Sequence, residues 1–112
     1  MRARDLVRAL KPLEGKTAAI NVYAGGPAWE FRQCIVRVRI LPPRERRDGA
    51  GNVILESGEV GADGAPGGIT MWARNVDTVE VDGERFVLRG THACGLATVI
   101  ITPEEDDDAD TC

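Results

Sequence analysis

Aromatic residues are scarce in this sequence, which has two Phe, two Trp and one Tyr among its 112 residues. A hydrophobic core must therefore consist mainly of Val, Ile, Leu and Ala, because apolar residues still make up an ordinary 43% of the chain. A chain of this length forms one domain, large enough to fold without a metal ion or disulfide bonds. This composition suits a small β-barrel or β-sandwich.

Residues that usually carry chemistry are also few. His92 is the only histidine, and groups as close in sequence as His92 and Cys94 rarely converge on one substrate. Cys34, Cys94 and Cys112 show no C-x-x-C spacing, so we expect reduced thiols and neither a zinc site nor a disulfide bond. The sequence therefore predicts no catalytic residue, no metal ligand, no cofactor and no enzyme activity.

Long apolar runs are absent as well. No segment approaches the ~18 apolar residues of a membrane-spanning helix. The basic N-terminus leads into Pro12 and charged residues instead of the apolar stretch of a secretory signal. We therefore expect a soluble protein that is made in the cytoplasm and does not bind membranes.

Charge is divided unevenly along the chain. Residues 1–50 hold eleven Lys and Arg against five Asp and Glu, whereas residues 51–112 hold three against thirteen. Six of the acids fall within residues 104–110, and we interpret residues 104–112 as an acidic, flexible tail. Docking of this tail on a basic surface of the same or a neighbouring subunit is the alternative.

Five arginines form the main basic cluster, at Arg37, Arg39, Arg44, Arg46 and Arg47. Flexible arginines attract nucleic-acid phosphates regardless of base sequence, although no aromatic residues are interleaved here to stack bases. The same side chains suit pairing with an acidic surface of an adjacent subunit, or they keep an exposed strand and loop soluble. We retain them as candidate channel-facing or partner-facing residues.

Periodicity predicts the elements of the N-terminal half. Leu6 and Leu10 are spaced as on one face of a helix that the following proline ends, so residues 1–12 predict a short amphipathic helix. Residues 15–23 alternate as a β-strand. The strongest expected strand covers residues 30–41, and one of its faces carries side chains that we expect in the core: Cys34, Val36, Val38 and Ile40.

A long polar loop is expected over residues 42–68. This segment contains seven glycines and several arginines, with room for a small hairpin around residues 52–56. Loops of this length inside a compact domain are usually functional or disordered.

The clearest local pattern is Asp77-Thr-Val-Glu-Val-Asp-Gly-Glu-Arg-Phe-Val-Leu-Arg-Gly90. Apolar side chains alternate on one face before and after a turn, at Val79, Val81, Phe86 and Leu88. Asp82 and Gly83 supply the positive φ that a two-residue hairpin turn requires. The pattern predicts a β-hairpin.

Strands at residues 69–73 and 96–102 flank this hairpin and bring the count to five or six. Because strands and helices do not alternate, the predicted fold is mainly β. We expect a small antiparallel β-barrel, SH3-like or related, over residues 1–103. A short N-terminal helix, the long loop and the acidic tail complete this fold.

The hairpin, together with the Ile-Thr-Met-Trp strand before it, resembles the C-terminal half of head–tail joining proteins of tailed bacteriophages, the small stopper or head-closure β-barrels. The resemblance covers roughly residues 69–102. It implies a virion structural protein that forms a homo-oligomeric ring below the portal–adaptor complex, closes the DNA channel and docks the tail. The implied partners are portal, adaptor and tail proteins, with non-specific DNA contact as a further option, and the implied location is the neck of the virion.

A second, weaker resemblance is to Sm-like RNA-binding barrels. It rests on the short helix, the strand count and Leu88-Arg89-Gly90, which is similar to the core of that family's second motif. It implies a cytoplasmic ring that binds RNA. Residues 42–68 are long for such a barrel, and Met71-Trp72-Ala73 lacks the expected Asn, so we rank it second. A small protein-interaction module is the third hypothesis.

Overall fold

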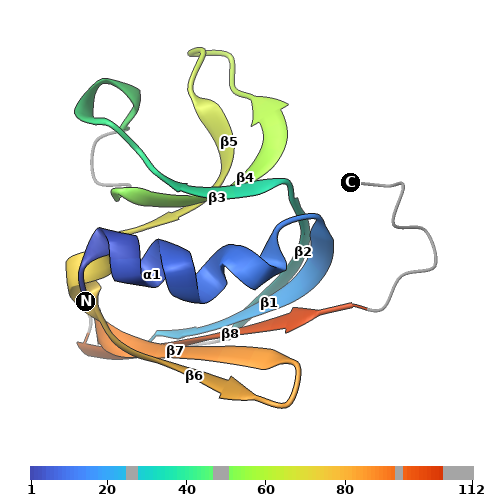
Figure 1. Cartoon of the computed structure of the whole chain (residues 1–112), viewed down its shortest axis with the longest axis vertical. Coiled ribbons are helices and arrows are strands. Elements are labelled where there is room, and N and C mark those ends of the chain that lie inside the picture. Colours follow the sequence, from blue (N-terminus) through green and yellow to red (C-terminus); the bar gives the residue numbers. More distant parts are fainter. Residues whose placement is uncertain (25–27, 47–50, 93–94, 105–112) are drawn as a thin grey trace.

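The chain forms a mainly β, antiparallel fold with a short N-terminal helix, which confirms the coarse prediction (Figure 1). The computed structural model describes residues 1–24, 28–46, 51–92 and 95–104. Its elements are α1 (Ala3–Leu10), β1 (Lys16–Ala24), β2 (Trp29–Ile35), β3 (Arg37–Ile40), β4 (Val53–Val60), β5 (Pro66–Met71), β6 (Val76–Asp82), β7 (Arg85–His92) and β8 (Gly95–Pro103). Three 3₁₀ turns join them: η1 (Lys11–Leu13), η2 (Pro43–Glu45) and η3 (Ala73–Asn75).

The strands form two hydrogen-bonded sheets. The larger sheet has the order β2-β1-β8-β7-β6, and the smaller sheet has the order β3-β4-β5. In Figure 1 the smaller sheet lies above the larger one, and α1 lies between them on the side facing the viewer. The apolar core fills the space enclosed by the two sheets and α1. None of the described helices is long and apolar enough to cross a membrane.

Helix α1 ends at Leu10, close to where the sequence predicts. Its inward side chains, Leu6 and Leu10, are fully buried. Pro12 is the second residue of the 3₁₀ turn η1, which replaces a further α-helical turn, and Leu13 of that turn is buried in the same core. The helix packs against β3, β4 and η3, and such packing is what stabilises a helix as short as this one.

The single strand expected over residues 30–41 is wrong, because the chain changes sheets at Val36. β2 ends at Ile35 in the larger sheet, and β3 begins directly after Val36 in the smaller sheet. Ile35 and Val38 are therefore buried, whereas Val36 is 46% exposed and Ile40 is 43% exposed. The break shifts the alternation by one residue. Of the four side chains that we expected in the core, Val38 is therefore buried as predicted, whereas Val36 and Ile40 are largely exposed.

Cys34 on β2 also differs from its prediction. Its side chain is only partly buried, and it is disulfide-bonded in the structure instead of being a reduced thiol. Cys94 and Cys112 lie outside the described residues. The expectation of a reduced thiol and of no disulfide bond is therefore wrong for Cys34.

The long loop expected over residues 42–68 contains two strands, β4 and the start of β5. The apolar run that begins β4 is fully buried: Val53, Ile54 and Leu55. The glycines that suggested a loop allow the two strands to approach closely. A Cβ at Gly68 would lie 2.2 Å from the Leu55 carbonyl oxygen, so glycine content here indicates tight strand pairing.

Strands β6 and β7 form the predicted hairpin with a small shift of the turn. Asp82 pairs with Arg85, so the turn residues are Gly83 and Glu84 instead of Asp82 and Gly83. Gly83 has a φ of +65°, and no described non-glycine residue has a positive φ. A positive φ at the first turn residue alone is the pattern of a type II′ turn, which requires glycine there.

Strand β8 lies in the middle of the larger sheet, between β1 and β7. Directly after it, the Glu104 backbone N–H donates to the Thr17 carbonyl at 2.8 Å. The Glu104 carboxylate also pairs with Arg32. Residues 105–112 lie outside the described residues, so the flexible tail stays a prediction, but Glu104 belongs to the folded domain.

Candidate functional site

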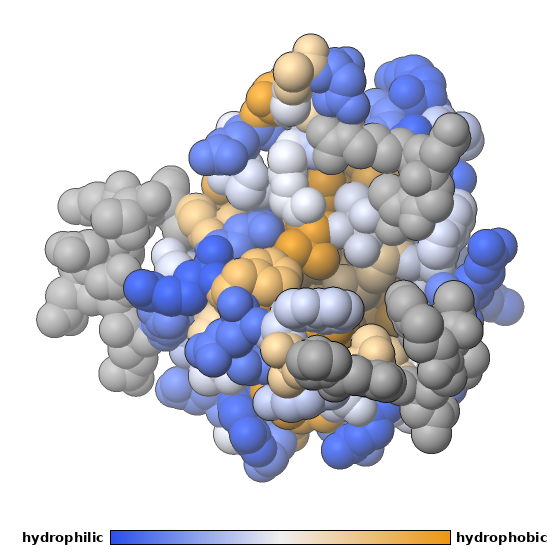
Figure 2. Space-filling model, turned by 180° about the vertical axis from the view of Figure 1, so that it is seen from behind, coloured by the Kyte–Doolittle hydropathy of each residue, from blue (hydrophilic) through white to orange (hydrophobic). Residues whose placement is uncertain are grey.

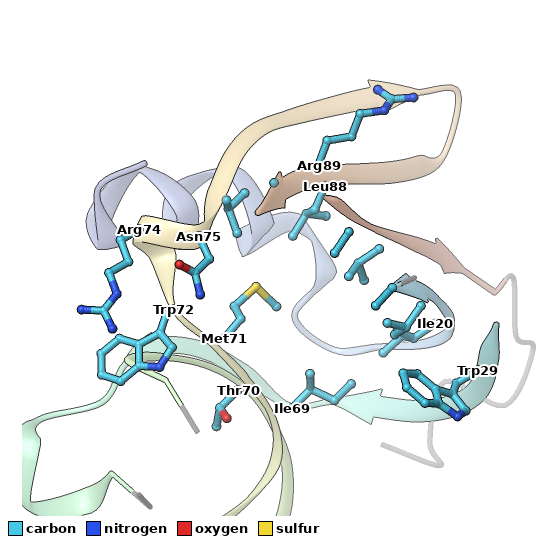
Figure 3. A pocket seen from close by; sticks show the side chains of 16 residues that line it. Ile20, Trp29, Ile69, Thr70, Met71, Trp72, Arg74, Asn75, Leu88 and Arg89 are labelled. Atoms are coloured by element: carbon cyan, nitrogen blue, oxygen red, sulfur yellow. The ribbon is translucent and has the colours of Figure 1, made fainter. Parts of the chain in front are cut away.

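An apolar cleft opens between the two sheets on the side away from α1, and none of its described lining residues belongs to α1. Its volume is about 610 Å³, within the ~300–1,000 Å³ that is usual for ligand-binding pockets. The walls come from β1, β2, β7 and β8, from β5, and from the connection between β5 and β6 (Figure 3). Figure 2 shows apolar surface near the centre of the molecule as seen from behind, bordered by hydrophilic residues.

The strand register forms the floor of the cleft. Residues directly opposite each other in an antiparallel pair share a face. One row of apolar side chains therefore crosses four strands of the larger sheet: Leu88, Val99, Val22 and Trp29. The next row contains only small residues: Gly90, Ala97 and Ala24. The small side chains of this second row give the cleft its depth.

Gly90 also explains why the connection between β5 and β6, which forms the rim of the cleft, lies over the floor. A Cβ at Gly90 would lie 1.8 Å from the Asn75 carbonyl oxygen, which is closer than any non-bonded contact. The connection between β5 and β6 therefore runs tightly over β7. This close approach brings Trp72, Arg74 and Asn75 to the rim of the cleft.

The rim places positive charge beside an aromatic ring. The Arg74 guanidinium carbon lies 4.5 Å from the centroid of the Trp72 ring, and that of Arg46 lies 6.0 Å from it. Figure 3 shows the Arg74 side chain next to the Trp72 indole. No acidic side chain in the described part of the chain forms an ion pair with Arg74. Its charge is therefore open to a partner.

Arg89 borders the same cleft but has a different role. Its side chain points away from the other labelled side chains in Figure 3. Its Nη1 lies 2.9 Å from the Oε2 of Glu80 on the neighbouring strand. Of the two arginines among the described lining residues, Arg74 is therefore the one without an acidic partner in the described part of the chain.

The structure divides the arginines of the predicted basic cluster. Arg37 and Arg39 on β3 both bind the buried carboxylate of Glu56, with Arg37 Nη2 at 3.1 Å from Oε2. A buried carboxylate requires such partners, because its desolvation is otherwise costly. Arg37 and Arg39 therefore both neutralise Glu56 within the chain, and the Arg37 side chain is still 57% exposed, so their contact with a partner stays a prediction.

Arg39 also pairs with Glu45, with Nη2 at 3.1 Å from Oε1. The hydrogen bond from Arg39 lowers the pKa of Glu45, and the same bond raises the pKa of Arg39. Each partner thus favours the charged form of the other. This network fixes η2 against β3.

Arg44 and Arg46 remain as candidate partner-facing residues. Arg44 is exposed, and Arg46 donates from Nε to the Leu41 carbonyl at 2.8 Å. Both line a polar hollow of about 500 Å³ between η2 and the turn that joins β4 to β5. Arg47 lies outside the described residues, so its placement stays a prediction.

Sequence reasoning missed Trp29, Trp72 and Arg74. No aromatic residue stands near the arginine cluster in the sequence, yet the fold brings Trp72 from the β5–β6 connection to Arg46 beyond β3. The available signal was the position of both tryptophans at strand ends in a chain with so few aromatic residues. Exposed aromatic side chains are typical of interaction surfaces.

His92 ends β7, and Cys94, its suggested partner, lies outside the described residues. Across the described ranges, no three His, Cys, Asp or Glu side chains gather as metal ligands. Comparison with protein-family models, with curated proteins and with solved structures finds no match.

Proposed function

We propose that this chain is a head–tail connector of a tailed bacteriophage, a non-enzymatic virion protein of the stopper type. Copies of the chain form a ring below the portal–adaptor complex in the neck of the virion. The ring closes the DNA channel and docks the tail. In this proposal the two sheets of each copy act as a small, SH3-like or related β-barrel.

One observation carries the proposal: the apolar inner face of the larger sheet is bare at both edges. A row of opposite residues crosses this face from β6 to β2: Val81, Phe86, Ile101, Ile20 and Phe31. The three central residues are buried, but Val81 is 65% exposed and Phe31 is 38% exposed. Trp29, also at the β2 edge, is 58% exposed. The smaller sheet meets β2 further along, where Gln33 donates to the Leu55 carbonyl, but Phe31, Trp29 and Val81 stay exposed.

Two different apolar surfaces on one copy support head-to-tail association. Such contacts close into a ring when the rotation between neighbouring copies allows it. Strands β2 and β6 each have only one neighbour in the sheet, and edge strands offer free backbone hydrogen-bonding groups to another chain. Exposed apolar patches of this kind mark protein–protein contacts.

The test uses a phage whose genome encodes this chain. Deleting the gene should yield filled heads that lack tails and lose their DNA, as seen by electron microscopy and by nuclease sensitivity of the packaged genome. Wild-type chain supplied in trans should restore tailed particles. Tailed particles that retain DNA without the chain would refute the proposal.

A variant tests the arginines in and directly after η2, of which the described ones, Arg44 and Arg46, do not take part in the Glu56 pairing. Changing Arg44, Arg46 and Arg47 together to Ser should leave the protein folded but reduce tail joining or DNA retention, because the phosphate-directed or partner-directed charge is lost. The matched control replaces the same number of arginines, Arg2, Arg4 and Arg8 of the N-terminal segment, with Ser. Equal particle yields from all three forms would argue against a functional basic site near η2.

The contact of Trp72 with Arg46 and Arg74 favours one alternative, an Sm-like ring that binds RNA. Sites for single-stranded nucleic acid combine basic side chains with aromatic rings that stack on bases, and Trp72 supplies such a ring beside the two arginines. Native mass spectrometry with a short RNA separates the two functions. A free ring that binds RNA supports the alternative, whereas a chain that ignores RNA and assembles with portal or tail proteins supports the connector.

A further inference from the structure

We propose that the β6–β7 hairpin tip of one copy inserts into the apolar cleft of a second copy. The tip comprises residues 80–85, and the cleft is the one bordered by Trp29, Trp72 and Arg74. This contact rests on the proposed ring, because it names the two surfaces that join neighbouring copies.

The tip carries an apolar side chain that a single copy leaves in water. Val81 is 65% exposed, although it lies opposite the buried Phe86 on the inner face of the sheet. The acids Glu80 and Asp82 are paired with arginines of the same hairpin. Glu84 has no hydrogen bond or ion pair within the described part of the chain. The tip thus presents the exposed apolar side chain of Val81 beside the unpaired negative charge of Glu84.

The cleft offers the complementary surface. Its floor is apolar, and Trp29 at one end is 58% exposed. Arg74 at the other end lies against Trp72 and has no acidic partner in the described ranges. An apolar side chain with a neighbouring carboxylate therefore meets an apolar floor with a neighbouring guanidinium. The volume of about 610 Å³ accommodates several side chains of a hairpin tip.

The positions of the two surfaces make the contact head to tail. The tip belongs to β6 at one edge of the larger sheet, whereas Trp29 belongs to β2 at the opposite edge. Each contact therefore leaves one tip and one cleft free, so the association continues until it closes. A two-fold dimer would instead bring both tips into both clefts at once, which requires the tip and the cleft to meet the partner on one common face.

Two variants separate the halves of the contact. Val81→Asp places a charge on the tip and leaves the cleft intact, while Trp29→Asp damages the cleft and leaves the tip intact. In sedimentation velocity at rising concentration, the wild type should associate beyond a dimer. Each variant alone should require at least about 10-fold more protein to associate, which corresponds to ~1.4 kcal/mol.

Mixing the two variants gives the sharpest result. The Trp29→Asp copy still has a working tip, and the Val81→Asp copy still has a working cleft. An equimolar mixture should therefore form a heterodimer that grows no further, because the remaining tip and cleft are both damaged. An unrelated contact does not give this result, and association of the wild type beyond a dimer excludes a reciprocal two-fold contact.

A charge exchange tests the polar part of the contact. Arg74→Glu should weaken association by about 10-fold, because it brings like charges together at the rim. Adding Glu84→Arg in the same chain should restore the wild-type association. Both side chains are exposed, so these variants decide the question even where Trp29→Asp fails to fold.

Val60→Asp is the matched control. Val60 is a 71% exposed valine close to another hairpin turn, on β4, and its change should leave association unaltered. A wild type that stays monomeric up to ~1 mM, or folded variants whose mixture forms no heterodimer, would overturn the contact. The proposed function is judged separately, because the gene-deletion particles report on tail joining whether or not this contact exists.

Discussion

The space between the two sheets is closed on one side and open on the other. On the closed side, Leu6, Leu10 and Leu13 have no exposed surface. On the open side, Val22 and Val99 of the cleft floor are only partly buried. The same face of the larger sheet therefore supports folding where α1 covers it and remains available for binding where the cleft leaves it bare.

This difference follows from the sizes of the elements. A five-stranded sheet is wider than a three-stranded sheet can cover, and α1 has only eight residues with which to complete the cover. The residue types match the division, with leucines on the closed side and tryptophans at the open side. Stability and binding are thus carried by different parts of one apolar layer.

The largest expected effect is on the closed side. Leu10→Ala should lower the free energy of unfolding by about 2–5 kcal/mol, because it leaves a cavity that the packed helix cannot fill. Val99→Ala on the open side should cost only about 1 kcal/mol, since its side chain already borders the cleft. Urea titrations of both variants measure the difference. Equal losses would mean that the two sides do not differ.

The next effect concerns the connection that forms the rim of the open side. Gly90→Ala should lower the free energy of unfolding by about 1–3 kcal/mol, because the added methyl group would overlap the Asn75 carbonyl. Gly64→Ala is the comparison for backbone strain alone: its added Cβ would meet no atom within 4 Å, but its φ of +79° disfavours a side chain, so it should cost only about 1 kcal/mol. A Gly90→Ala protein as stable as the wild type would contradict the close approach of η3 to β7.

The hairpin tip lies outside both the closed and the open side, so a change there should lower the free energy of unfolding less. Gly83→Val should cost about 1–2 kcal/mol, because a β-branched residue disfavours the positive φ at this position. Glu84→Val is the control, since the second turn residue has a negative φ. Thermal melts compare the two variants. A larger loss from Glu84→Val would refute the type II′ turn.

A smaller, pH-dependent effect tests how η1 is attached on the closed side. Glu14 Oε2 accepts the Val38 N–H at 2.8 Å and lies 3.1 Å from Lys11 Nζ. The bond from the Val38 backbone, with help from Lys11, lowers the pKa of Glu14 below its ordinary value of 4.5. A depressed folded-state pKa gives stability that is present above the unfolded value and is lost as the pH falls through the folded value.

The stability difference between wild type and Glu14→Gln should therefore be full near neutral pH and should shrink as the pH falls below about 4.5. Urea titrations at several pH values measure it. The change Glu30→Gln, at an exposed acid on β2, serves as the control. A difference that is constant across this range would show that the carboxylate charge at Glu14 is unimportant.

Local spacing predicts the elements whose signal lies within a few residues. Leu6 and Leu10 lie one helical turn apart and alone mark the buried face of α1, and the alternation around Gly83 marks the β6–β7 hairpin. The change of sheets at Val36 has no such signal. Ile35 and Val36 are both apolar, so either alternation fits the sequence, and only the position of the second sheet decides which face is buried.

The cleft could not be predicted from the sequence for a related reason. It exists because Gly90, Ala97 and Ala24 fall in one row across three strands, and strand register is not visible in a single sequence. The contact between Arg46 and Trp72 likewise joins distant segments. Composition suggested free charge at Arg37 and Arg39, whereas the fold supplies Glu56 as their partner.

The smallest expected effect separates the domain from the acidic tail. Truncation after Glu104 removes a strongly acidic segment with almost no apolar residues to bury, so the melting temperature should remain unchanged. Truncation after Thr102 should cost about 0.5–1.5 kcal/mol, because Pro103 pairs with Ala18 and the Glu104 N–H donates to Thr17. Calorimetry of both truncated proteins decides where the domain ends. A lower melting temperature for the protein truncated after Glu104 would mean that residues 105–112 contribute to the stability of the domain.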